Sequence, residues 1–453
     1  MHIHILGICG TFMGGIAAIA RQAGFRVTGS DQKVYPPMSD QLRALDIDII
    51  EGFGVEQLDL KPDLIVIGNV MSRGMPIIEE ILSRKLPFCS GPQWLYDCIL
   101  KDRHVIAVSG THGKTTTTSM VSWILEHAGF NPGYLVGGVP ANFDVSARLG
   151  SDPFFVIEAD EYDTAFFNKQ AKFLNYRPNT LIVNNIEFDH ADIYKDIDAI
   201  LWQFHQLLRM LPANGNCIAL ADDAYTDQLL EMGCWTPVTR FIAGRSAAGW
   251  SAERSAPDQL AFYCDGELRG ECYWPHPAEF NIENALAALL AVMSAGVGFQ
   301  ASLDGLATFR GVKRRMELLG DFGGVRLYDD FAHHPTAIQR SLEGMKQFNA
   351  GRVLAVLEPR SNTMKMGAHA DQLSAAIAPA DKCWVMQPDG MSWALSDVLD
   401  ADLSVEVMLS VDAIVASVVA AAKPGDAIVI MSNGSFDGIY GKFRAALSTA
   451  FAA

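Results

Sequence analysis

The stretch VSGTHGKTTTT, residues 108–118, constrains the fold of this chain more than any other part of its sequence. It joins a β-branched run at residues 104–108 to a helical pattern over residues 115–128. Strand, glycine turn and helix in this order form a phosphate-binding loop, whose backbone N–H groups face an anion. In such a loop Lys114 reaches the outer phosphates and the Thr115 hydroxyl binds Mg²⁺. The first glycine of the usual pattern is missing, so a turn without a ligand is the alternative.

Size and composition predict a globular protein of about three domains. The chain has 453 residues, of which 49% are hydrophobic and 19% charged, enough to fill real cores. Its net charge of −17 argues against a nucleic-acid partner, which requires clustered Lys and Arg. No obligate protein partner is evident from the sequence.

The cysteines and the apolar segments predict a cytoplasmic protein with no membrane partner. The eight cysteines are scattered without a C-x-x-C pair, so we expect reduced thiols. The first residues, MHIHILG, lack the basic and apolar regions of a signal peptide. The apolar stretch at residues 413–422 is too short to span a bilayer.

Short apolar runs alternate with helical patterns along the chain, which predicts an α/β fold of three domains in series. We expect a Rossmann-like domain at residues 1–103, a central P-loop ATPase domain at 104–312 and a Rossmann-like domain at 313–453. Residues 216–274 are more irregular, and we expect this region to be rich in β-structure. Strands are expected at residues 2–6, 26–28, 63–68, 104–108, 154–158, 180–184, 325–328, 352–357, 382–386 and 426–431, and helices at 13–23, 115–128, 200–211 and 279–295.

The N-terminal turn GICGTFMGG, residues 7–15, predicts a second nucleotide site. It follows the first expected strand, and Asp31 closes the second. The dinucleotide pattern G-x-G-x-x-G fails because Cys9 and Phe12 hold two of its glycine positions. The N–H groups of the turn can still hold a nucleotide diphosphate, with Asp31 bonded to the ribose or the base. A packing turn without a ligand is the alternative.

Acidic and polar side chains follow two expected strands of the central block. Carboxylates that could hold Mg²⁺ opposite Thr115 directly follow one of these strands, at Glu158, Asp160, Glu161 and Asp163. The next strand ends in NNIEFDH, residues 184–190, at the same carboxyl edge of the sheet. We therefore favour a metal-binding role for His190 over that of an ordinary core or loop histidine.

Three further polar groups have both a functional and an ordinary interpretation. Asn281 and Asn284 share one helix face, from which an amide can pair with an adenine edge or simply cap the helix. Residues 313–315, KRR, are most simply a solvated basic turn. Residues 329–336, DDFAHHPT, crowd polar side chains at a strand end, which favours a site.

Together these residues resemble the Mur ligase family, ATP-dependent enzymes that join amino acids or peptides to UDP-N-acetylmuramate during cell-wall synthesis. The phosphate loop of that family reads G-T-x-G-K-[ST], as residues 110–115 do, and it has no earlier glycine. The resemblance covers essentially the whole chain in the family's order of three domains. It implies a cytoplasmic ligase that uses ATP and Mg²⁺.

The resemblance also implies a role for each matching residue. Lys114, Glu158 and His190 are expected to be catalytic, and Thr115, Glu158 and His190 to hold Mg²⁺. Asn281 and Asn284 are expected to bind adenine, Arg315 phosphate and Asp330 the ribose. The whole expected ATP site is Gly110, Thr111, His112, Gly113, Lys114, Thr115, Thr116, Asn281, Asn284, Arg315 and Asp330. The expected UDP-N-acetylmuramate site is Cys9, Gly10, Thr11, Phe12, Met13 and Asp31, although Cys9 and Phe12 depart from the usual glycine-rich loop of the branch that adds the first residue.

Longer strings, such as residues 158–163 and 358–367, resemble the branch of the family that recycles cell-wall peptides. That branch attaches the tripeptide L-alanyl-γ-D-glutamyl-meso-diaminopimelate to UDP-N-acetylmuramate through an acyl phosphate, releasing ADP and phosphate. We expect Arg360, Ser361 and Asn362, which follow a strand, to bind the carboxylates of the tripeptide. A helix start with ordinary capping is the alternative for this loop.

Three other functions remain open from the sequence. A ligase that adds single L-alanine belongs to the same family but needs a smaller pocket. A nucleotide-sensing protein without activity is a second option, against which intact Lys114, Glu158 and His190 argue. A nicotinamide dehydrogenase is a third, disfavoured by the broken glycine pattern.

Overall fold

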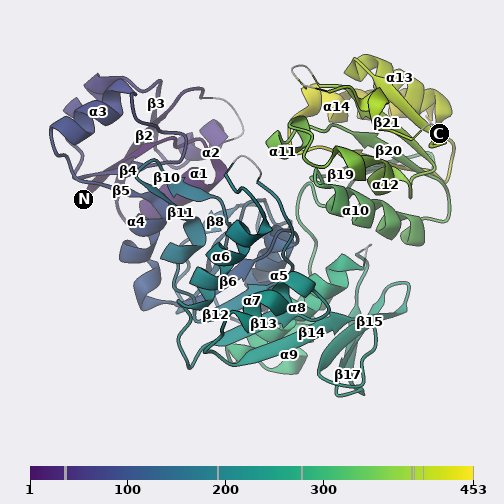
Figure 1. Ribbon diagram of the computed structural model, residues 1–453, viewed down its shortest axis with the longest axis horizontal. Coiled ribbons are helices and arrows are strands. Elements are labelled where there is room, and N and C mark those ends of the chain that lie inside the picture. The colour runs from purple at the N-terminus through teal and green to yellow at the C-terminus, as the bar shows by residue number, and fades with distance from the viewer. Residues whose placement is uncertain are drawn as a thin grey trace.

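The computed structural model describes residues 1–34, 38–190, 193–276, 279–388, 391, 393–400 and 402–451. Within these ranges three α/β domains follow one another along the chain, each built on its own main sheet. In Figure 1 the N-terminal domain, in purple, and the C-terminal domain, in green and yellow, lie at opposite sides above the teal central domain. This arrangement confirms the predicted α/β class with three domains in series.

The N-terminal domain is a five-stranded parallel sheet in the order β3-β2-β1-β4-β5. Alternate residues of β4 enter separate cores: Val66 packs with α1 on one face, and Ile65 and Ile67 pack with α3 on the other. The elements are β1 (His2–Leu6), α1 (Thr11–Gln22), β2 (Arg26–Asp31), α2 (Met38–Arg43), β3 (Asp48–Glu51), η1 (Val55–Leu60), β4 (Leu64–Ile67), α3 (Pro76–Ser83), β5 (Phe88–Ser90), α4 (Gly91–Cys98) and η2 (Leu100–Asp102).

The central domain contains a ten-stranded sheet in the order β17-β16-β15-β14-β13-β12-β6-β9-β7-β8 and a separate hairpin of β10 and β11. Its strands and helices are β6 (His104–Ser109), α5 (Lys114–His127), β7 (Gly133–Leu135), β8 (Ala147–Arg148), β9 (Phe154–Glu158), β10 (Asp163–Ala165), β11 (Asn168–Ala171), η3 (Lys172–Asn175), β12 (Thr180–Val183), α6 (Ile197–Leu208), β13 (Asn216–Leu220), α7 (Ala224–Glu231), β14 (Val238–Ala243), β15 (Trp250–Ala256), β16 (Gln259–Cys264), β17 (Glu267–Tyr273), α8 (Phe280–Ser294) and α9 (Phe299–Ala307). The β-rich character expected for residues 216–274 is confirmed. There β13 and β14 continue the parallel sheet, and β15, β16 and β17 extend it as an antiparallel meander.

The C-terminal domain is a six-stranded sheet in the order β18-β19-β23-β20-β21-β22, antiparallel between β18 and β19 and parallel elsewhere. Helices α10 and α12 bury one face, and α13 and α14 bury the other. The elements are β18 (Glu317–Phe322), β19 (Val325–Asp330), α10 (Pro335–Phe348), β20 (Val353–Leu357), α11 (Asn362–Lys365), η4 (Ala370–Gln372), α12 (Leu373–Ile377), β21 (Lys382–Met386), η5 (Leu395–Asp397), β22 (Val405–Met408), α13 (Val411–Ala421), β23 (Ala427–Met431), η6 (Phe436–Gly438) and α14 (Ile439–Ala450).

Strand order brings the polar segments of the central sheet together. β6 pairs with β9 on one side and with β12 on the other, all in parallel. The phosphate loop after β6 therefore lies between the acidic segment after β9 and the polar segment after β12. Open α/β sheets bind ligands at this carboxyl edge, where the loops of neighbouring parallel strands converge.

The thiols and the apolar helices agree with the sequence-based expectations. All eight cysteines are free. The apolar stretch around residues 413–422 forms most of α13, which buries Val411, Ile414, Val415 and Val418 in the core of the C-terminal domain. Among the helices of the described ranges, none is long and apolar enough to cross a membrane.

A buried histidine relay fixes the centre of the N-terminal sheet. His4 lies in β1 with no exposed surface, its Nδ1 is 2.8 Å from Thr28 Oγ1, and its Nε2 is 3.1 Å from Gln57 Oε1. Gln57 Nε2 in turn donates to the Gly52 carbonyl at 2.9 Å, which leaves its Oε1 to accept from His4. The neutral ring therefore carries its proton on Nε2 and accepts from Thr28 at Nδ1. Burial lowers the pKa of His4 to about 4.

We expect the N-terminal domain to lose stability as the pH falls from 6.5 to 4. In this range the unfolded chain binds a proton at His4 that the folded chain excludes, so acid favours unfolding. The shift corresponds to about 3 kcal/mol. Urea unfolding at pH 7 and pH 4.5 measures it, and the variant His4→Gln should show a smaller difference between the two. An equal difference in the variant and the wild type would contradict this account.

Candidate active site

The phosphate loop is held in shape by contacts that only glycine permits. Gly113 has φ of +82°, and a Cβ there would lie 2.3 Å from Asn284 Oδ1. The loop is also tied to the segment after β12, because His112 N donates to Asn185 Oδ1 at 2.8 Å and Thr111 N donates to the Asn185 carbonyl at 2.9 Å. The N-terminus of α5 thus faces a fixed turn, which is the geometry of an anion site.

Lys114 is buried among acids at the start of α5. Its Nζ lies 2.8 Å from Glu161 Oε2 and donates to the Gly110 carbonyl at 2.7 Å. Burial alone would lower the pKa of Lys114, but the carboxylates of Glu161 and Asp160 raise it above its ordinary value. Lys114 therefore carries a positive charge at the end of the phosphate loop.

A carboxylate and a hydroxyl meet beside Lys114. Thr115 Oγ1 donates to Glu158 Oε1 at 3.0 Å, and Gly137 N donates to Glu158 Oε2 at 2.7 Å. Arg315, which comes from the connection to the C-terminal domain, donates from Nη2 to Thr115 Oγ1 at 3.2 Å. Burial raises the pKa of Glu158 in spite of the nearby Lys114. A half-buried carboxylate held next to a hydroxyl suits a divalent cation that takes oxygen ligands.

His190 contacts a different carboxylate from the one that the sequence interpretation paired it with. Its Nε2 lies 3.2 Å from Glu161 Oε1, and its ligand nitrogen clusters with oxygens of Asp160 and Glu161 within 4.8 Å. Burial alone would lower the pKa of His190, but the hydrogen bond with Glu161 raises it to about 9. His190 has φ of +57°, an uncommon conformation that clusters at functional sites. It lines the same cavity as Glu158, with Lys114 also in its wall.

The residues expected to bind ATP line one cavity of about 250 Å³ between the central and C-terminal domains. Gly110 is the exception: it does not line the cavity, although its carbonyl accepts a hydrogen bond from Lys114 Nζ. The cavity wall includes Thr111, His112, Gly113, Lys114, Thr115, Thr116, Glu158, His190, Asn281, Asn284, Arg315 and Asp330. Tertiary structure thus gathers residues that are more than 200 positions apart in the sequence.

Polar side chains from two segments line this cavity. Asn284 Oδ1 accepts from Thr117 Oγ1 at 3.0 Å, and Asn284 Nδ2 lies 3.4 Å from Asn281 Oδ1 in the first turns of α8. Asp330 accepts from Met316 N at 3.0 Å, and burial raises its pKa. The buried amides of Asn281 and Asn284 and the buried carboxyl of Asp330 are the kinds of hydrogen-bonding group that a base and a ribose need.

A second cavity of about 620 Å³ lies at the carboxyl edge of the N-terminal sheet. Asp31 orders its main loop by accepting from Cys9 N at 2.8 Å and from Gln32 N at 2.8 Å. Its wall includes all six residues expected to bind the nucleotide sugar, Cys9, Gly10, Thr11, Phe12, Met13 and Asp31. Glu158 and Asp160 line both cavities, so the two sites meet at these carboxylates.

Sequence reasoning missed Lys172 in the second cavity. Its Nζ donates to Asp160 Oδ2 at 2.8 Å and lies 5.6 Å from the centre of the Phe12 ring. Burial alone would raise the pKa of Asp160, but Lys172 and Lys114 lower it. No local pattern marks this lysine, because it follows the β10–β11 hairpin and reaches the site only through the fold.

The first residues of the loop expected to bind the peptide line neither cavity. Arg360 is exposed, and neither it nor Ser361 lines the two cavities described above. The side chain of Asn362 is outside the described part of the structure. The loop approaches the central domain through Thr363, whose Oγ1 donates to Asp189 Oδ1 at 3.2 Å beside His190. Peptide binding by Arg360, Ser361 and Asn362 stays a prediction.

Comparison with known families matches each of the three domains. The description "Mur ligase family, catalytic domain" applies to residues 2–103, "Mur ligase middle domain" to residues 108–292, and "Mur ligase, glutamate ligase domain" to residues 314–434. The matches follow one another in the order of the three sheets.

Individual relatives extend over nearly the whole chain. UDP-N-acetylmuramate–L-alanyl-γ-D-glutamyl-meso-2,6-diaminoheptandioate ligase of Escherichia coli is 48% identical over 98% of this chain and 97% of its own length. UDP-N-acetylmuramate–L-alanine ligase of Mycobacterium avium is 34% identical over 95% of this chain and 92% of its own length.

A solved structure agrees with these sequence relatives. A murein peptide ligase from Psychrobacter arcticus superimposes with a TM-score of 0.76 and is 45% identical, covering 99% of this chain and 98% of that protein. Since the family matches, the relatives and the three-domain fold agree, this chain belongs to the Mur ligase family.

Proposed function

We propose that this chain is an ATP-dependent ligase that joins the tripeptide L-alanyl-γ-D-glutamyl-meso-diaminopimelate to UDP-N-acetylmuramate through an acyl phosphate. The identity of 48% over 98% of the chain to a ligase of that name supports the choice of substrates. The structural observation that carries the proposal is that the nucleotide-sugar cavity and the ATP cavity share Glu158 and Asp160. A carboxylate held in one cavity therefore meets the terminal phosphate held in the other.

Each domain takes one substrate in this proposal. Residues 1–103 bind UDP-N-acetylmuramate, residues 104–312 bind ATP, and residues 313–453 bind the tripeptide. We place the reaction in the cytoplasm, where ATP and nucleotide sugars are found and where free thiols such as these eight stay reduced.

The protein's own groups neutralise and align the phosphates. The lactyl carboxylate of UDP-N-acetylmuramate attacks the γ-phosphorus, the bond to ADP breaks, and an acyl phosphate forms. Such a step needs positioning and charge neutralisation more than covalent help from the protein. Lys114 and Arg315 supply two cations to the phosphate oxygens, and Asn281, Asn284 and Asp330 fix the nucleoside.

Thr115, Glu158 and His190 are the residues that we expect to hold Mg²⁺. Thr115 and Glu158 fit this role, because their oxygens already lie 3.0 Å apart. Burial raises the pKa of Glu158 in spite of the nearby cations, so the site has room for a further positive charge next to this carboxylate. Bound Mg²⁺ would withdraw charge from the phosphate oxygens. His190 fits through its position beside Asp160 and Glu161 in the same cavity wall.

The second step forms the amide. The α-amine of the tripeptide attacks the acyl carbon, the bond to the phosphate oxygen breaks, and inorganic phosphate leaves. Water must be kept from the acyl phosphate, and its position at the junction of two cavities between three domains serves this purpose.

The substrate assignment is tested by phosphate release from ATP in the presence of Mg²⁺ and UDP-N-acetylmuramate. One reaction receives the tripeptide and the other receives free L-alanine. We expect kcat/KM to be about 100-fold higher with the tripeptide. Its additional carboxylates can bind polar groups of the protein that have no partner when L-alanine is bound. Preference for L-alanine would assign the chain to the other branch, and no release with either would favour a nucleotide-binding protein without activity.

A further inference from the structure

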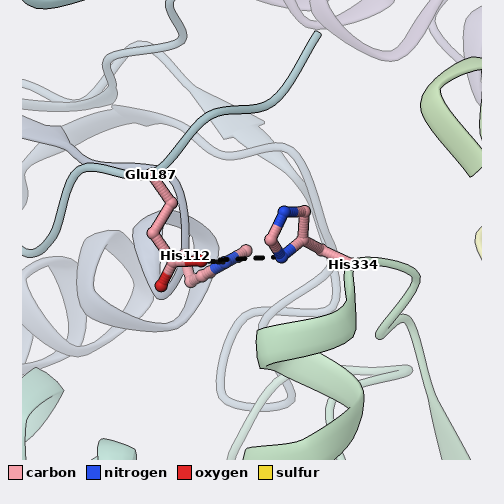
Figure 2. A group of neighbouring side chains, drawn as sticks. All are labelled: His112, Glu187 and His334. Carbon is pink, nitrogen blue, oxygen red and sulfur yellow. Dashed lines mark hydrogen bonds and ion pairs between the residues drawn. The ribbon is translucent and has the colours of Figure 1, made fainter. Parts of the chain in front are cut away.

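Three side chains from distant segments meet at the boundary between the central and C-terminal domains. Figure 2 shows His112 from the phosphate loop, Glu187 from the segment after β12 and His334 from the start of α10 pointing toward one another. Their ligand atoms all lie within 4.8 Å of each other. We call this set the His112–Glu187–His334 cluster.

Two distances in the cluster are close to the edge length of a tetrahedral metal site. His112 Nε2 lies 3.3 Å and His334 Nδ1 lies 3.6 Å from Glu187 Oε2. Ligands about 2.0–2.1 Å from a tetrahedral Zn²⁺ ion are roughly 3.3 Å apart. Two histidines and one glutamate with an open fourth position also form a known type of zinc ligand set.

His334 has the most buried side chain of the three. Its side chain is 5% exposed, and within the described residues neither ring nitrogen has a hydrogen-bond partner. Buried polar atoms are rarely left in this condition. Burial lowers the pKa of His334 to about 4, so the ring is neutral at pH 7 and offers a lone pair.

Glu187 is held as an anion in a fixed orientation. Thr336 Oγ1 donates to Glu187 Oε2 at 2.6 Å. Burial alone would raise the pKa of Glu187, but hydrogen bonds with His112 and Thr336 lower it to about 2. The centre of the His369 ring lies 4.6 Å from the centre of the His334 ring, and this packing restricts rotation of the His334 ring. Such supporting contacts orient metal ligands and raise their affinity.

We propose that the His112–Glu187–His334 cluster binds a transition-metal ion of the zinc type and thereby fastens the C-terminal domain to the phosphate loop. Imidazole ligands favour such an ion over Mg²⁺, which takes oxygen ligands. The site is distinct from the oxygens of Thr115 and Glu158. The inference does not depend on which peptide the ligase uses.

Metal uptake by the full chain tests the proposal. Zn²⁺ is titrated calorimetrically into nucleotide-free protein in excess MgCl₂, and Co²⁺ serves as a spectroscopic probe of coordination. The variant His334→Gln should bind one Zn²⁺ fewer than the wild type and lose the Co²⁺ absorption of a four-coordinate site. The variant Thr336→Val should bind that ion about tenfold more weakly, because Glu187 loses its orienting hydrogen bond.

Two control variants separate this site from its neighbours. His190→Gln disrupts the second candidate cluster, Asp160, Glu161 and His190, and should leave the tetrahedral Co²⁺ spectrum in place. His333→Gln removes the adjacent histidine, whose Nδ1 lies 2.9 Å from the Phe331 carbonyl, and should retain full uptake. Circular dichroism checks that each variant is folded.

The outcomes are distinct. Uptake by folded His334→Gln equal to that of the wild type would overturn the proposal, as would loss of the ion in His190→Gln alone. Loss in His334→Gln with retention in both control variants supports it. A Zn²⁺-dependent decrease in the radius of gyration of the wild type, absent in His334→Gln, would support fastening of the two domains.

Discussion

Replacement of Lys114 by alanine is expected to lower the rate of ATP-dependent phosphate release by about 10³-fold. Its ammonium group lies at the N-terminus of α5, where it can neutralise charge that develops on the transferred phosphate. The assay is phosphate release with saturating UDP-N-acetylmuramate and tripeptide. Turnover of Lys114→Ala at the wild-type rate would contradict the mechanism proposed for this site.

Folding has to be separated from catalysis in this variant. Lys114→Ala leaves the buried Glu161 with His190 as its remaining ionic partner, so we expect a loss of stability of up to about 3 kcal/mol. Lys114→Gln can still donate to Glu161 and should be more stable but equally inactive. Lys169→Ala is the matched control, because Lys169 pairs with Asp163 at 2.5 Å with its side chain 65% exposed. This control should keep wild-type turnover and stability.

Replacement of Glu158 by glutamine is expected to lower turnover about 100-fold and to raise the Mg²⁺ concentration required for half-maximal rate at least tenfold. The change removes the negative charge next to Thr115 but keeps the shape of the side chain. Titration of the initial rate with MgCl₂ at saturating ATP measures both effects. An unchanged Mg²⁺ dependence would remove Glu158 from the metal site.

Glu158→Gln should lower turnover but should not lower the stability of the fold. Because burial raises the pKa of Glu158 above its ordinary value, the ionised carboxylate at neutral pH is less favourable in the folded chain than in the unfolded one. A neutral amide avoids this cost, and its NH₂ group can donate to the Thr115 hydroxyl while its oxygen accepts from Gly137. We expect a melting temperature equal to or above that of the wild type without ligands. Glu126→Gln, which changes a carboxylate paired with Arg148 elsewhere in the domain, should leave the Mg²⁺ dependence unchanged.

Local sequence patterns were sufficient for the fold class, and they led to most of the residues that line the cavity proposed to bind ATP. The phosphate loop is encoded within a few residues, because a strand, two glycines in left-handed turns and a helix start determine its backbone. Strands β6, β9 and β12 were evident from their apolar runs, and parallel strands place their following loops at one edge. The family's motifs then led to Asn281, Asn284, Arg315 and Asp330, which line that cavity.

The pairing of charges in the site was not available from the sequence. Glu161, and not Glu158, forms the ion pair with Lys114, although the two glutamates are three residues apart. The difference comes from the chain leaving β9, which turns Glu161 toward the helix start while Glu158 stays opposite Thr115. A sequence pattern gives the residue types that follow a strand but not the directions in which their side chains point.

The sequence by itself determined the family, the order of the three α/β domains and the phosphate loop. Each of these depends on residues that are neighbours in the sequence, so it can be recognised from short motifs without knowing any tertiary contact. Only the tertiary structure decided that Lys172 enters the nucleotide-sugar cavity, that Arg360 stays outside both cavities and that His112, Glu187 and His334 meet. The physical reason is that such contacts are set by strand order, loop paths and domain packing. These bring together segments that are distant in the sequence, such as those of His112 and Glu187, and their free energies are sums over many weak interactions that no short pattern encodes.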